Sequence, residues 1–243
     1  LYGTMDLKTF SEKNISNATF QQDKPFGYII NVDFTNGAVS ISENYSQWPQ
    51  DESISENFEL IDNSETISIA DKFLKDHKIS VDNYGKAKIM ESGQQKIVQI
   101  VYPLIVNGRN VYNPDGTDIG IFVSVDMEHK MVSSLYGLGT QKYQASSYPV
   151  VQGKKNILSM VESEYSSNNS DCRPSDADME KQKRLNGISK IYLSTPEAAY
   201  VQISRNDSGS YGEFLVPAFA FPIKNPIDSR EKIIVPLVKG LDL

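Results

Sequence analysis

Apolar residues alternate along the first third of the chain in a pattern that predicts a β-hairpin. The alternation runs over residues 28–34 and resumes over residues 39–41, on either side of an Asn36-Gly37 turn. Asn-Gly favours a type I′ turn, whose twist matches that of paired strands. Residues 48–65 follow without any period, are acidic and contain the single Trp. This stretch is interpreted as a linker or a wrapping loop.

Residues 65–78 predict an amphipathic helix, because apolar residues including Ala70 and Leu74 recur on one face. Asp62 or Ser64 is placed to cap its amino end. Five strands are predicted after the helix, at residues 86–90, 98–106, 109–112, 119–125 and 131–136. The pattern therefore indicates one helix followed by an antiparallel meander.

The second half of the chain repeats this order loosely. A helix is predicted over residues 154–165, and four strands follow at residues 188–193, 199–204, 214–223 and 232–238. Pro217, Pro222 and Pro236 fall inside the last two strands and cannot donate ladder hydrogen bonds. Those two strands are therefore expected to be edges, to be bulged, or to be shorter than the pattern.

These elements predict an α+β fold of antiparallel β-sheets, with one helix packed per unit and two loosely repeated helix-plus-meander units. Three segments follow from the pattern. Residues 1–64 form an amino-terminal segment with the hairpin and the acidic linker, residues 65–149 form the first helix-plus-meander unit, and residues 150–243 form the second.

Composition narrows the range of functions. The chain has 243 residues and a net charge of -7, with 24 basic against 31 acidic side chains, so it lacks the cationic surface that nucleic-acid binding requires. One Cys and two His exclude disulfide frameworks, Cys-rich zinc sites and catalysis that needs several imidazoles. The longest apolar stretch, residues 214–223, is about half of the ~20 residues that a membrane helix needs.

The few reactive side chains do not predict a nucleophilic site. His77 falls in the last turn of the first predicted helix and His129 in a hairpin turn, and both are interpreted as solvated surface residues. Cys172 lies in a polar loop between Asp171 and Arg173, which is not a setting that lowers a thiol pKa. A Ser/His/Asp or Cys/His constellation is therefore not expected.

Carboxylates are a further class of candidate for a functional site. Asp115, Asp118, Asp126 and Glu128 gather around one predicted hairpin and could serve a hydrolase, although spacing alone does not give their separation. The turn at residues 113–118 resembles a calcium loop faintly but lacks the full ligand series, so a simple turn is favoured.

Gly137 and Gly139 follow a strand without completing a phosphate-binding motif, and are interpreted as a turn. No catalytic, cofactor-binding or metal-ligating residue is predicted, and no cofactor is expected. Exposed aromatic residues are instead the candidates for a contact surface, namely Tyr136, Tyr143, Tyr148 and Tyr211.

Residues 65–138 resemble the PepSY type of domain. Ala70 holds the helix position of that pattern, and Val125-Asp126 with Val132 hold its strand signature, although His129-Lys130 replace the usual Gly. Two such units in tandem resemble membrane-anchored regulatory proteins of the YycI and YycH type, and exported proteins of small-genome bacteria. The resemblance implies an extracytoplasmic α+β module that binds protein or peptide and is not a catalyst.

The resulting expectation is a non-enzymatic interaction or regulatory domain at the bacterial cell surface. Because the sequence begins with Leu1, we expect a removed amino-terminal segment that anchors the chain to the membrane. Its partner is expected to be a protein of the membrane or cell envelope. Two alternatives remain, a carboxylate-based hydrolase acting on glycan or peptide and a structural subunit of a surface assembly.

Overall fold

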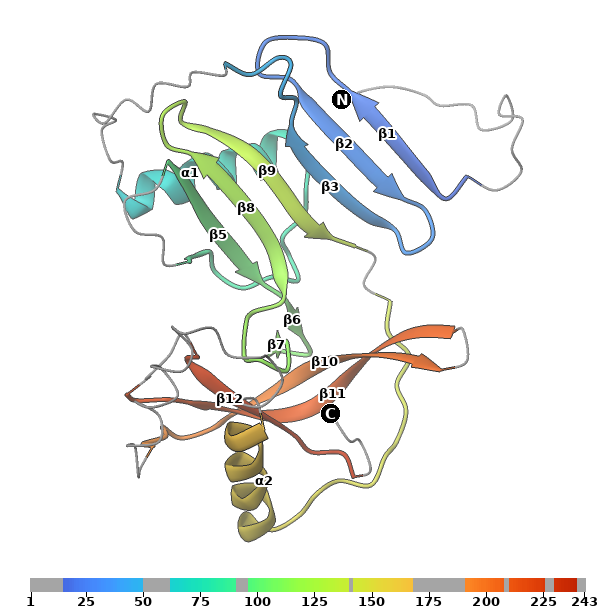
Figure 1. Cartoon of the computed structure of the whole chain (residues 1–243), viewed down its shortest axis with the longest axis vertical. Coiled ribbons are helices and arrows are strands. Elements are labelled where there is room, and N and C mark those ends of the chain that lie inside the picture. The colour runs from blue at the N-terminus through green and yellow to red at the C-terminus, as the bar shows by residue number, and fades with distance from the viewer. Residues whose placement is uncertain are drawn as a thin grey trace, which may run out of the picture. The chain divides into compact units, whose positions relative to one another are not determined.

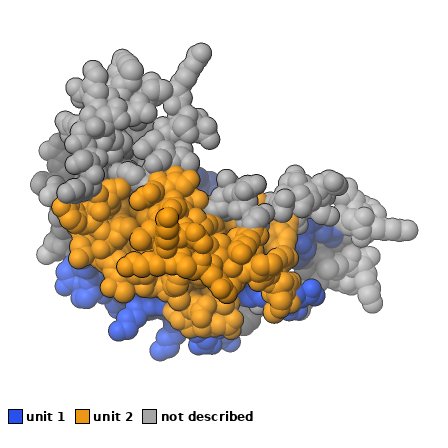
Figure 2. Space-filling view, turned by 90° about the horizontal axis from the view of Figure 1, so that it is seen from below, with its two compact units in different colours: residues 1–104, 120–144 blue, residues 105–119, 145–243 orange. Residues whose placement is uncertain are grey.

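The computed structural model describes residues 15–49, 62–90, 96–139, 142–167, 191–207, 210–225 and 230–239. This part of the chain forms an α+β fold, as predicted, from two helices and two β-sheets (Figure 1). The chain divides into two compact units, coloured in Figure 2. Unit 1 comprises residues 1–104 and 120–144, and unit 2 comprises residues 105–119 and 145–243.

Unit 1 is built on a seven-stranded antiparallel sheet of order β1-β2-β3-β9-β8-β5-β4. Its strands are β1 (Asn17–Gln21), β2 (Tyr28–Asp33), β3 (Ala38–Glu43), β4 (Lys88–Ile89), β5 (Ile97–Pro103), β8 (Gly120–Asp126) and β9 (Met131–Leu138). The predicted hairpin is confirmed as β2 and β3. It belongs to the same sheet as the meander, because β3 pairs with β9, so the compact units divide the chain differently from the three predicted segments.

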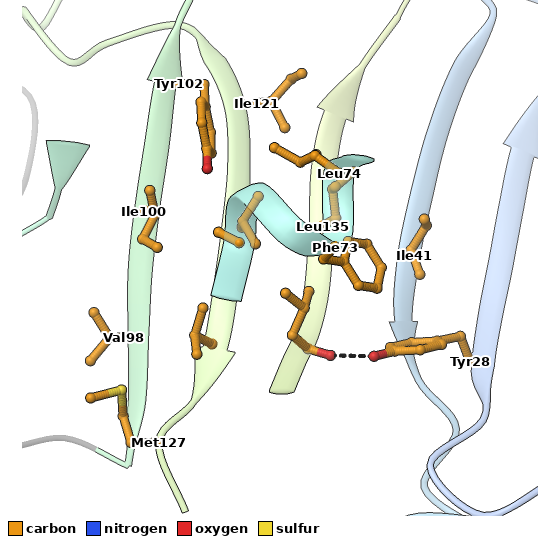
Figure 3. Close-up of a cluster of buried hydrophobic side chains, with 14 of the residues drawn as sticks. Tyr28, Ile41, Phe73, Leu74, Val98, Ile100, Tyr102, Ile121, Met127 and Leu135 are labelled. Atoms are coloured by element: carbon orange, nitrogen blue, oxygen red, sulfur yellow. Dashed lines mark hydrogen bonds between the residues drawn. The ribbon is translucent and has the colours of Figure 1, made fainter. Parts of the chain in front are cut away.

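Helix α1 (Asn63–Asp76) confirms the predicted first helix and begins two residues earlier than its pattern. Asp62 is the N-cap, since its side chain accepts a hydrogen bond of 2.8 Å from the Glu65 N–H. The buried face of α1 lies against β5, β8 and β9 (Figure 3). Ala70 is fully buried there and Leu74 is 2% exposed, so the helix approaches the sheet closely at Ala70.

Aromatic residues complete the core of unit 1 beside the helix. Trp48, placed in the linker by the sequence pattern, is 5% exposed, and its Nε1 donates a hydrogen bond of 2.8 Å to the Gly27 carbonyl. Tyr28 donates a hydrogen bond of 2.7 Å to the Val132 carbonyl (Figure 3). Trp48 is therefore a core residue, while residues 50–61 of the predicted linker lie outside the described residues.

Unit 2 contains a five-stranded sheet of order β12-β11-β10-β7-β6 and helix α2 (Lys154–Ser167). Its strands are β6 (Ile105–Val106), β7 (Arg109–Tyr112), β10 (Glu197–Asp207), β11 (Ser210–Pro222) and β12 (Lys232–Pro236). Strands β7 and β10 are parallel, so the expectation of purely antiparallel sheets is wrong for this unit. The first predicted meander is also interrupted, because β6 and β7 pair within the sheet of unit 2.

The turn chemistry differs from the expectation at the first hairpin. Gly37 has a positive φ of 73° but Asn36 does not, whereas a type I′ turn requires positive φ at both central residues. The predicted turn type is therefore wrong, because a four-residue loop joins β2 to β3. The type I′ geometry is found between β6 and β7, where Asn107 and Gly108 have φ values of 49° and 72°.

Strands β11 and β12 confirm part of what their prolines led us to expect. Strand β12 is an edge and ends at Pro236, as expected. Strand β11 is central, yet it contains Pro217, whose carbonyl accepts from the Leu237 N–H just past the end of β12. The missing N–H of Pro217 therefore falls where the β12 ladder has already ended.

Of the predicted strand at residues 188–193, residues 188–190 lie outside the described residues and Leu193 forms only an isolated bridge with Ile223.

Replacing Ala70 with Leu should lower the free energy of unfolding of unit 1 by about 1–3 kcal/mol, because the added methylenes have no space between α1 and the sheet. Chemical denaturation monitored by Trp48 fluorescence would measure this change. Lys72→Leu is the matched control, since Lys72 is exposed on the same helix. Equal effects of the two substitutions would contradict the packing argument.

Candidate functional site

Polar side chains gather in unit 1 around the turn between β8 and β9. Asp126, the last residue of β8, is 3% exposed. Its carboxylate accepts hydrogen bonds from the backbone N–H groups of Glu128 at 2.9 Å and His129 at 3.1 Å. It also lies 3.0 Å from Nδ1 of the His129 ring. The sequence places a carboxylate here because it caps the turn, supplying an acceptor for two N–H groups that would otherwise lack one.

His129 is packed between this carboxylate and two aromatic rings. Its ring centroid is 5.4 Å from that of Phe26 and 6.0 Å from that of Trp48, both in edge-on arrangements. Only 19% of the side chain is exposed. The interpretation of His129 as a solvated surface residue is therefore wrong, because the Phe26 and Trp48 rings cover it. His77, by contrast, is exposed at the end of α1, where its Nδ1 lies 2.9 Å from the Phe73 carbonyl.

Glu43, at the end of β3, adds a second carboxylate to the neighbourhood. Burial raises the pKa of Glu43, the negative charge of Asp126 raises it further, and Lys96 and His129 oppose this effect. Lys96 also pairs with Glu128 at 2.7 Å. Burial, with the charge of Glu43, raises the pKa of Tyr28 to about 12.

This acid–histidine cluster, defined as Glu43, Asp126, Glu128 and His129, has some of the chemistry of a functional site. One ligand atom from each of the last three lies within 4.8 Å of the others, so a divalent cation could in principle be held. However, Asp126 is already engaged by the turn, and the Lys96 ammonium already neutralises Glu128. Among the described residues, no hydroxyl or thiol is hydrogen-bonded to the His129 ring. Asp126, Glu128 and His129 are therefore engaged in holding the turn.

Replacing Asp126 with Ala should lower the free energy of unfolding by about 2–3 kcal/mol, because two backbone N–H groups lose their buried acceptor. Asp33→Ala is the matched control in the same unit, since Asp33 caps its own hairpin through a solvent-exposed hydrogen bond, accepting from the Thr35 N–H at 2.8 Å. Its loss should cost about 1 kcal/mol or less. Urea denaturation of both variants would measure the difference, and equal losses would contradict a buried capping role.

Replacing Glu43 with Gln should stabilise unit 1 at neutral pH. The pKa of Glu43 is higher in the folded than in the unfolded chain. Its protonated form therefore contributes stability that is complete below the unfolded pKa and is lost as the pH rises through the folded pKa. The melting temperature of the Gln variant should exceed that of the wild type at pH 7, and the gap should close below about pH 4. A gap that persists unchanged at low pH would contradict this account.

The structure separates the other predicted candidates. Asp115 and Asp118 belong to unit 2, whereas Asp126 and Glu128 belong to unit 1. Asp115 accepts hydrogen bonds from the N–H and hydroxyl of Thr117 at 2.9 and 2.7 Å, which is the simple turn that the sequence favoured. Cys172 lies outside the described residues.

Gly137 does not form the expected turn. It lies within β9 with a φ of 85°. A Cβ at this position would come 2.1 Å from the Gly120 carbonyl oxygen on the neighbouring strand. Glycine is therefore needed here for close packing of β9 against β8.

The face of the unit 1 sheet that points away from α1 carries Tyr136, one of the exposed aromatic residues. Tyr136 stacks on Phe122 with ring centroids 4.8 Å apart and an interplanar angle of 7°. Its hydroxyl accepts a hydrogen bond of 2.7 Å from Gln99. Tyr136 remains 42% exposed, in keeping with its expected place on a contact surface. Tyr143 and Tyr148 are also exposed, while the side chain of Tyr211 lies outside those described.

A groove with a volume of about 390 Å³ lies beside Tyr136, lined by β1, β2, β3 and the end of β9. Most of its lining positions, including Thr19, Asn31 and Ser40, alternate with core positions and so belong to the face away from α1. Thr19 donates a hydrogen bond of 2.8 Å to Asn31. We call this surface, from Gln99 and Phe122 across Tyr136 to the groove, the open face. Sequence reasoning missed the groove because β1 is short and polar.

Comparison with known proteins adds little to this description. No family model and no curated protein matches the chain. Among solved structures the chain is similar to the Bacillus megaterium YpeB C-terminal domain, with 16% identity and a TM-score of 0.35 over 95% of this chain and 92% of that chain. A likeness at this level does not establish a shared fold.

Proposed function

We propose that the chain is a non-enzymatic extracytoplasmic domain, tethered at the bacterial cell surface, and that it binds a protein partner through the open face of unit 1. The observation that carries this proposal is the open face itself. Helix α1 covers one side of the sheet, and on the other side the Phe122–Tyr136 stack and the adjoining groove are accessible among the described residues. Aromatic residues of this kind are enriched in protein interfaces.

The resemblance of residues 65–138 to PepSY-type domains supports the same function. Its characteristic positions have structural roles here, since Ala70, Val125 and Val132 are buried in the core and Asp126 caps a turn. None of the helices in the described part of the chain is long and apolar enough to cross a membrane.

The alternative of a carboxylate-based hydrolase gains no support from the geometry. Such enzymes need one carboxylate free to act as a base or nucleophile and another free to act as an acid. The adjacent pair, Asp126 and Glu128, is occupied by backbone N–H groups and by Lys96 respectively. A structural role in a surface assembly would use the same open face and differs from the proposal only in the partner.

A photo-crosslinking amino acid placed at Tyr136 should trap this partner on intact cells that express the full-length protein. We expect one main adduct with a membrane or envelope protein, at a yield near stoichiometric. The matched control places the same amino acid at Lys72, which is exposed on α1 and faces away from the open face. It should give little or no adduct.

Two results would overturn the proposal. One is the absence of any adduct from position 136, together with turnover of cell-wall glycan or peptide that is lost on Glu128→Gln. The other is an adduct of equal yield from position 72, which would place the contact surface elsewhere on unit 1.

A further inference from the structure

We propose that the chain also self-associates, by antiparallel pairing of β1 with β1 of a second copy to give one continuous sheet. This inference goes beyond the proposed function, because the contact lies at the edge of β1 and the partner is another molecule of the same chain. It is carried by the outer edge of β1, with which no described strand pairs, by the direction of its main-chain groups and by the self-complementarity of its side chains.

Strand β1 differs from the other strands that end the two sheets. β4 and β6 have two residues each, which is too short to template a partner strand. β12 ends in Pro236, and residues 149–151 bond to the segment that follows it, with Val151 N–H donating to the Leu237 carbonyl at 2.7 Å. β1 has five residues, NATFQ, with no charge and no proline, and pairs with β2 in unbroken register. It therefore lacks the features that protect natural edge strands.

The main-chain groups of β1 are set out for pairing. Phe34 N–H donates to the Ser16 carbonyl and Gln22 N–H to the Tyr28 carbonyl, both at 2.8 Å, so even-numbered residues bond to β2. In an antiparallel ladder the intervening residues point their N–H and C=O groups the other way. Asn17, Thr19 and Gln21 thus direct these groups to the free edge. Another extended backbone has groups at the same spacing and can replace the water bound to all of them.

A two-fold axis at Thr19 makes this edge complementary to itself. All three outward residues are then used, with Thr19 opposite Thr19 of the second copy and Asn17 opposite its Gln21. On the side facing α1, the small Ala18 lies opposite the large Phe20. No like charges meet, because the strand carries none, and Thr–Thr pairs are favourable across strands. If the two-fold axis lay at another residue of β1, some of the outward N–H and C=O groups would have no partner in the second copy.

The interface is small, which places the dimer in the weak class. Five residues of paired strand bury less than the roughly 1,200 Å² of a stable complex. Self-association should therefore become visible only as the protein is concentrated. If the chain is held at a surface, the higher effective concentration would favour pairing.

Sedimentation velocity of the full chain, from micromolar to near-millimolar concentration, tests the proposal. The wild type should shift from monomer towards dimer. Thr19→Pro removes one outward N–H at an edge position that tolerates proline, and should weaken the dimer about tenfold or more. Thr19→Val keeps the N–H and should dimerise like the wild type. Thr19→Lys places like charges opposite each other and should weaken the dimer in a way that added salt reverses.

Disulfide trapping gives a second, independent readout. The paired Thr19 Cα atoms should lie about 5.5 Å apart, within the range that a disulfide spans. Thr19→Cys in a Cys172→Ser background should therefore form a covalent dimer on oxidation. Thr35→Cys in the same background, at the exposed tip of the β2–β3 hairpin, should not. A monomer at all concentrations, or a dimer that Thr19→Pro and Thr19→Lys leave unchanged, would overturn the proposal.

Discussion

One helix covers a sheet that is wider than the helix, and the rest of unit 1 follows from that constraint. Seven strands at a spacing of ~4.8 Å span roughly 29 Å, whereas a helix with its side chains is about 10 Å wide. Helix α1 accordingly packs mainly on β5, β8 and β9, where Ala70 lets it approach closely, and reaches β2 through the contact of Phe73 with Tyr28. β2 and β3 must be covered by other side chains, and β1 is left at the margin. The same arrangement leaves the opposite side of the sheet without a helix among the described residues.

The chain covers β2 and β3 with aromatic residues from its own loops and from β2 itself. Trp48 and Tyr28 pack edge-on at 6.0 Å, and Phe26 packs on Trp48 at 5.3 Å. Each polar atom that this brings inside has a partner, since the Trp48 N–H bonds to Gly27 and the Tyr28 hydroxyl to Val132. The aromatic residues also bury the His129 ring beside Asp126. The partly buried position of the acid–histidine cluster is thus a consequence of how the sheet is covered.

Much of the fold was predictable from local pattern, and the largest failures were non-local. The helix at Ala70 and the strands around it were predictable because burial of one face makes apolar residues recur every 3.6 positions in a helix and every 2 positions in a strand. Pairing of β3 with β9 joins residues about ninety positions apart, and no local signal marks it. The move of β6 and β7 into unit 2 depends on a parallel pair with β10, which is equally remote. At the candidate site, the hairpin position of His129 was predictable, but its burial by Phe26 and Trp48 was not.

The residues that carry the PepSY resemblance have structural roles, so they give little information about function. A small residue at position 70 lets the helix pack closely, apolar residues at 125 and 132 fill the core, and the carboxylate of Asp126 caps a turn. All of these are conditions for folding. They would be required whatever the domain binds, so a resemblance resting on them informs about the fold more than about the partner. Specificity for a partner has to come from side chains that the fold does not need.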